Sequence, residues 1–180
     1  MSTQNTNYDD VKQYRLDPER EKELVNTAGE CVFCWANKSG HPIGVITAYV
    51  PVKGKIWMTA TRERVRVKAI ARDGRSSVVM SSKGTAMGGG KTVTYKGHTV
   101  VHDDQETKMW MYNLLARGMA ARPDDGNEFT AGLDPELFVR FLDTPERVVL
   151  EFTSELSIPF DGDKMAKGTA AAYAEFAKEA

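Results

Sequence analysis

The sequence predicts a mainly β domain, a small antiparallel barrel with helices at its periphery. About six strand-like segments follow one another, several of them joined by short turns that contain glycine. Helical patterns occur at three places between and around them, without the regular β-α alternation that predicts a parallel sheet. The 180 residues are enough for one domain with a core of its own.

The first elements form an antiparallel meander. Residues 1–16 are expected to be a flexible N-terminus. Asp17 and Pro18 combine an N-cap with a proline at the first helical position, which predicts a helix to about Asn26. Strands are expected over 30–37, 43–50 and 55–59, with turns at Lys38-Ser39-Gly40 and Lys53-Gly54.

A basic segment, residues 59–75, follows the third of these strands. It holds six cationic side chains in a chain whose formal net charge is -1. The stripe through Val65, Ala69 and Arg72 predicts a helix that Gly74 ends. Positive charge gathered immediately after a strand predicts an anion-binding site. The alternative is a solvated helix face whose charges pair with Glu63 and Asp73.

The second half alternates strands and helices. A helix is expected from Asp103 until Gly118 closes it, and Asp134-Pro135 repeats the cap-and-proline signal for a short helix through Leu142. The other expected elements are strands over 75–82, 91–101 (interrupted at Lys96-Gly97), 147–152 and 154–159, a glycine loop over 84–90, a mobile loop over 122–132 and an alanine-rich helix over 169–180.

Composition excludes several classes of function. Hydrophobic residues make up 41% and charged residues 27%, and the isoelectric point near 6.3 argues against general nucleic-acid binding. No apolar run approaches the roughly 20 residues that span a bilayer, and residues 1–14 lack the hydrophobic region of a signal peptide. We expect a cytoplasmic protein without membrane or nucleic-acid partners.

Cys31 and Cys34 form a Cys-x-x-Cys pair that invites a redox or zinc interpretation. The segment around them reads as a strand, on which residues three apart point to opposite faces. Two buried small side chains are the better interpretation, since no second cysteine pair completes a zinc site. The three histidines are scattered, so no metal is expected.

Several motifs occur in an order that resembles a known family. Thr59-Ala60-Thr61 precedes the basic helix, Arg72-Asp73-Gly74-Arg75 and a strand rich in serine and valine. Tyr95-Lys96-Gly97-His98 and Asp103-Asp104 follow, and later Arg147-Val148-Val149-Leu150 precedes Ser157-Ile158-Pro159-Phe160. Together they resemble the flavin-binding split-barrel family that includes pyridoxamine 5'-phosphate oxidase, over most of residues 18–165.

The resemblance implies a six-stranded antiparallel split β-barrel over residues 17–165, followed by a helical tail over 166–180. It implies a homodimer with FMN or a deazaflavin coenzyme in a groove shared by the two subunits. A small-molecule substrate would enter between the subunits.

The resemblance also implies site residues. Met58, Thr59 and Ala60 at the strand end would contact the ring edge of the cofactor. The phosphate would be bound by Arg64, Arg66 and Lys68. Thr61 would cap the helix or donate its hydroxyl. Further cofactor-binding candidates, of second rank, are Ser81 and Ser82. Val65-Arg66 stands where the family commonly has an Arg-Lys pair or a lysine. No catalytic side chain is implied.

The function expected from the resemblance is an FMN-dependent oxidoreductase that transfers hydride to or from a small molecule. A deazaflavin-dependent reductase is the first alternative, with Arg62 and Arg72 serving a more anionic cofactor. The second is a non-catalytic protein that carries or senses flavin, pyridoxal phosphate or haem on the same scaffold.

Overall fold

The structure is a computed structural model that describes residues 9–120 and 132–179. The chain divides into two compact units. The first comprises residues 1–28, 79–94 and 157–180, and the second comprises residues 29–78 and 95–156. Half of the N-terminus expected to be flexible, residues 1–8, and nearly all of the expected loop over 122–132 lie outside the described residues.

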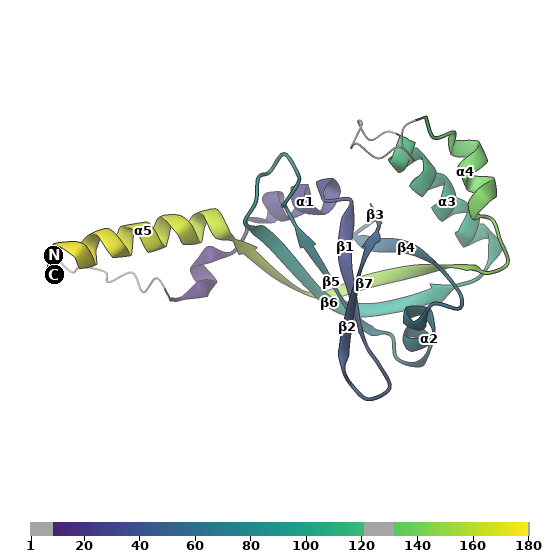
Figure 1. Ribbon diagram of the computed structural model, residues 1–180, viewed down its shortest axis with the longest axis horizontal. Coiled ribbons are helices and arrows are strands. Elements are labelled where there is room, and N and C mark those ends of the chain that lie inside the picture. The colour runs from purple at the N-terminus through teal and green to yellow at the C-terminus, as the bar shows by residue number, and fades with distance from the viewer. Residues whose placement is uncertain (1–8, 121–131, 180) are drawn as a thin grey trace. The chain divides into compact units, whose positions relative to one another are not determined.

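The second unit is built on an antiparallel sheet that curls into a half-barrel (Figure 1). This confirms the mainly β prediction, although the sheet has seven strands rather than six. Their order is β2-β1-β5-β6-β7-β4-β3, and residues 79–81, 91–94 and 157–161 of the three middle strands belong to the first unit. The strands are β1 (Glu30–Ala36), β2 (Pro42–Ala48), β3 (Val50–Val52), β4 (Lys55–Thr61), β5 (Arg75–Ser81), β6 (Lys91–His102) and β7 (Arg147–Asp161).

Alternating burial explains why these segments form strands. In β1, β4 and β5 every second side chain is buried, as a half-buried sheet requires. Phe33 and Phe152 are fully buried. β3 was not expected. It forms a hairpin with β4 through Lys53 and Gly54, which both have positive φ (51° and 77°), the combination that a two-residue hairpin turn needs.

Two expected interruptions are wrong. β6 runs without a break through Gly97, because that glycine lies against β7: a Cβ there would meet the Thr153 oxygen at 2.0 Å. Likewise β7 is one strand, not two, and continues through Thr153. Both positions are places where the backbones of two strands come close, and a glycine serves that purpose as well as it serves a turn.

The helices of the second unit are α2 (Val65–Arg72), α3 (Gln105–Ala120) and α4 (Pro135–Leu142). Asp134 caps α4 as expected, since its carboxylate accepts from the N–H groups of Glu136 and Leu137. Gly118 does not close α3, which continues to Ala120. α3 and α4 pack together in a buried cluster that includes Tyr112.

The first unit holds η1 (Val11–Tyr14), α1 (Pro18–Thr27) and α5 (Gly162–Glu179). α1 begins where the Asp17-Pro18 signal predicts. α5 begins seven residues before the expected tail helix, at Gly162 instead of Thr169, because the Asp161 carboxylate accepts from the N–H groups of Asp163 and Lys164. No helix of the described residues is long and apolar enough to cross a membrane.

Candidate cofactor-binding site

The second half of β4 has an edge that no strand in residues 9–120 and 132–179 covers. On one side, β4 pairs with β7 along its whole length, from Lys55 to Thr61. On the other side β3 pairs only as far as Trp57. Backbone groups of successive residues alternate between the two neighbouring strands, and the Arg62 N–H donates to the Glu146 carbonyl on the β7 side. Beyond Trp57, the backbone groups that face the uncovered side are therefore those of Thr59.

The start of α2 lies directly after this edge and carries two guanidinium groups. Arg64 is the N-cap residue and makes no side-chain cap hydrogen bond. The N–H groups of Val65 and Arg66 have no partner among residues 9–120 and 132–179. Such unpaired N–H groups at a helix start favour an anion.

Arg64 and Arg66 form no ion pair with any described carboxylate. Burial and the neighbouring Arg64 guanidinium both lower the pKa of Arg66, as expected for a half-buried cation without a counter-ion. Two unneutralised positive charges and two open N–H groups thus meet at one helix end. This combination favours the binding of an anion.

The other four cations of the basic segment are engaged. Arg62 donates to Asp103 at 2.6 Å, which lowers the pKa of that carboxyl, and Lys68 donates to Glu63 at 2.5 Å. Arg75 binds Asp73 and lowers its pKa to about 2. Arg72 donates to the Ala36 carbonyl. Of the three side chains expected to hold a phosphate, Lys68 is therefore the one with a competing partner.

The expected ring contacts are divided between the two faces of β4. Met58 and Ala60 are 1% and 3% exposed as whole residues, so both belong to the core, backbone included, and their ring contacts stay predictions. Thr59 and Thr61 lie on the opposite face. The Thr59 hydroxyl donates to the Val148 carbonyl at 3.0 Å.

Sequence reasoning missed a polar cluster on the same face of β4 as Thr59. Glu151 accepts hydrogen bonds from Lys55 Nζ and from His102 Nε2, the latter at 2.8 Å. The His102 ring stacks on Trp57 with centroids 5.7 Å apart, and Trp57 meets Trp110 edge to face at 4.7 Å. These partners lie far apart along the chain, so no local spacing signals them.

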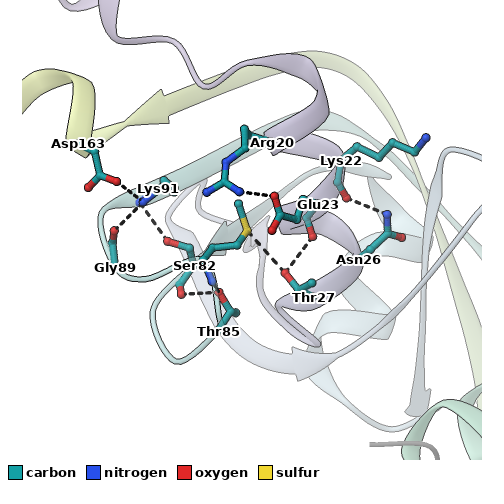
Figure 2. Close-up of polar contacts among 11 residues, drawn as sticks. Arg20, Lys22, Glu23, Asn26, Thr27, Ser82, Thr85, Gly89, Lys91 and Asp163 are labelled. Atoms are coloured by element: carbon teal, nitrogen blue, oxygen red, sulfur yellow. Dashed lines mark hydrogen bonds and ion pairs between the residues drawn. The ribbon is translucent and has the colours of Figure 1, made fainter.

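Ser81 and Ser82 belong to the first unit, at the start of the glycine loop. Figure 2 shows Ser82 beside Thr85 and Lys91. Ser82 is fully buried and its hydroxyl accepts from the Lys91 N–H at 3.1 Å. Ser81 accepts from the Lys83 N–H. Lys91 is itself buried, and its ammonium binds Asp163 and the Gly89 carbonyl. The geometry gives both serines a role in the loop, and their cofactor contacts stay predictions.

The cysteines occupy opposite faces of β1, as expected. Cys31 is buried, and burial raises the pKa of its thiol to about 12. Cys34 is only half-buried, which differs from the expectation of two buried side chains. Within the described residues, no group of three or more His, Cys, Asp or Glu side chains is arranged to hold a metal ion.

No family model and no curated protein matches the sequence. Solved structures do match. The conserved hypothetical protein Rv2991 from Mycobacterium tuberculosis is 14% identical with a TM-score of 0.67, over 85% of this chain and 89% of that chain. A Clostridium acetobutylicum protein related to general stress protein 26, of the pyridoxinephosphate oxidase family, is 15% identical with a TM-score of 0.55, over 83% and 99%.

An F420 reductase is 9% identical with a TM-score of 0.55, over 76% of this chain and 94% of that chain. The chain has the fold of the flavin-binding split barrels. At these identities the likeness extends to the split-barrel fold and not to a particular activity. The activity has to be argued from the residues of this split barrel.

Proposed function

We propose that this split barrel binds FMN at the uncovered edge of β4 and at the start of α2, and that it transfers hydride to or from a small molecule. The observation that carries the proposal is the pair Arg64 and Arg66. Among the described residues, these guanidinium groups have no carboxylate partner, and they directly follow the uncovered edge of β4.

The residues present fit a phosphate monoester. Such a group carries up to two negative charges and three acceptor oxygens, which match two guanidinium groups and two backbone N–H groups. Arg66 is half-buried, so its interaction with an anion is less screened than that of an exposed lysine. Arg64 and Arg66 would hold the phosphate, and Lys68 would add long-range attraction.

The uncovered edge of β4 fits the polar edge of a flat ring, because Thr59 offers one backbone donor and one backbone acceptor there. Thr59 would contribute its backbone groups, and the buried residues Met58 and Ala60 hold the strand in place. A bound flavin supplies the hydride chemistry, so the chain has only to bind, orient and shield.

A deazaflavin coenzyme is the second candidate, and the F420 reductase with the same fold supports it. The cations that a longer anionic tail would need are partly engaged, because Arg62 binds Asp103 and Arg72 binds the Ala36 carbonyl. This favours FMN. A carrier without turnover is the third candidate.

A spectrum and two titrations test the proposal. The visible spectrum of the purified protein is recorded, and apo protein is then titrated with FMN and with the deazaflavin coenzyme. We expect micromolar or tighter binding of FMN and weaker binding of the deazaflavin. Absence of binding for both ends the proposal, while binding without turnover of any reductant selects the carrier.

A further inference from the structure

The second unit contains a cavity that the proposed cofactor site does not use. Its volume is about 400 Å³, within the range of small-molecule pockets. Its lining comes from β1, β2, β5, β6 and β7 and includes none of residues 58–68.

The cavity has apolar walls, and part of its space is kept free by a glycine that no larger residue can replace. Trp35, Ala36 and Pro42 line one part of it. Gly97 lines another part, and a side chain there is excluded because its Cβ would meet the Thr153 oxygen at 2.0 Å. A substitution cannot fill this position without moving β6 from β7.

Three charged residues line the same cavity, and Arg75 is paired with Asp73. The other two carry opposite charges and do not neutralise each other. Lys96 and Glu155 are both exposed. Neither forms an ion pair with the other or with any charged group in the described part of the chain. A ligand that brings one negative and one positive group would pair both.

Trp35 contributes an apolar ring to the cavity wall. The residue is 6% exposed and its Nε1 is buried, so the indole offers a ligand a hydrophobic surface and no accessible donor. Trp35 also places a fluorescent ring in the cavity wall.

We propose that this cavity binds a small zwitterion with an apolar body, such as an amino acid. Its carboxylate pairs with Lys96, its ammonium pairs with Glu155, and its apolar part lies against Trp35 and Pro42. This site is independent of the proposed cofactor, so its failure and that of the cofactor site are separate results.

Three probes that differ only in charge test the proposal by calorimetry and tryptophan fluorescence. L-phenylalanine carries both charges, 3-phenylpropionate only the negative one and 2-phenylethylamine only the positive one. We expect L-phenylalanine to bind about tenfold more tightly than either other probe, since each charged contact adds to affinity. The fluorescence change is expected to disappear in Trp35→Phe.

Charge variants assign the contacts. Lys96→Met is expected to weaken the binding of L-phenylalanine and 3-phenylpropionate about tenfold and to leave that of 2-phenylethylamine unchanged. Glu155→Gln is expected to weaken the binding of L-phenylalanine and 2-phenylethylamine about tenfold and to leave that of 3-phenylpropionate unchanged. Lys53→Met, at an exposed turn outside the cavity, is the matched control and should change none. The proposal is overturned if L-phenylalanine does not saturate below about 10 mM. Equal effects of both variants on all three probes overturn it as well.

Discussion

Arg66 and Lys68 lie two positions apart on one helix, yet their side chains have different surroundings. Arg66 is half-buried next to Arg64 and has no described carboxylate partner, whereas Lys68 is exposed and bound to Glu63. The residue types at this site could be predicted from the sequence. The choice among the cations could not, because it depends on which carboxylate the fold brings near each one.

Glu151 provides a test of the polar cluster on β4. Burial raises the pKa of its carboxyl, but hydrogen bonds from Lys55 and His102 outweigh burial and hold the pKa below its ordinary value of 4.5. A carboxyl whose pKa is lower in the folded state stabilises the protein above pH 4.5 and loses this contribution as the pH falls.

We therefore expect Glu151→Gln to lower the free energy of unfolding by roughly 1–3 kcal/mol near neutral pH, and by less near pH 4. Urea unfolding at the two pH values measures the difference. Glu155→Gln, which removes an exposed carboxylate without a described partner, is the control and should show little change. If Glu151→Gln lowers the free energy of unfolding by the same amount at both pH values, the assigned hydrogen bonds are contradicted.

Among the helices and strands, the first residues of helices were easier to predict than the ends of helices or interruptions of strands. Asp17-Pro18 and Asp134-Pro135 both precede helices that begin where expected. Glycine was harder to interpret, because Gly74 follows the end of α2 while Gly118 lies inside α3. A glycine in a sequence can mark a turn, a helix end or a close approach of two backbones, and only its surroundings in the fold show which of these applies.

Gly97 and Gly118 make a matched pair for this point. Gly97→Ala brings a Cβ to within 2.0 Å of the Thr153 oxygen, and we expect a loss of about 1–3 kcal/mol of unfolding free energy or a failure to fold. Gly118→Ala meets nothing within 4 Å and should stabilise α3 by about 0.5–1 kcal/mol. Thermal unfolding measures both. Equal melting temperatures for the two variants would contradict the close approach of β6 and β7.

At the scale of the whole molecule, the order of motifs was enough to predict the split-barrel fold, although no single motif was. The order of the strands was not predictable, because β4 lies between β3 and β7 and the last of these is about 90 residues away along the chain. Pairings at that separation leave no periodic signal in the sequence. The strand that the sequence did not predict is β3, whose three residues are too few to show a periodic pattern.

The homodimer implied by the resemblance stays a prediction. Large apolar side chains of the second unit are exposed, among them Ile46 at 70% and Phe141 at 66%, and such side chains gather at interfaces. Sedimentation equilibrium is expected to give twice the chain mass of 20.0 kDa. A single-chain mass throughout the micromolar range would contradict the dimer.

The phosphate site at Arg64 and Arg66 is tested most directly by comparing FMN with riboflavin, which has the same ring and no phosphate. The wild-type protein is expected to bind FMN at least tenfold more tightly than riboflavin, and Arg66→Ala to remove most of that preference. Lys68→Ala removes the same charge from a side chain already paired with Glu63 and should reduce the preference less. Equal affinity of the wild-type protein for FMN and riboflavin, or an undiminished preference in Arg66→Ala, would contradict the assignment.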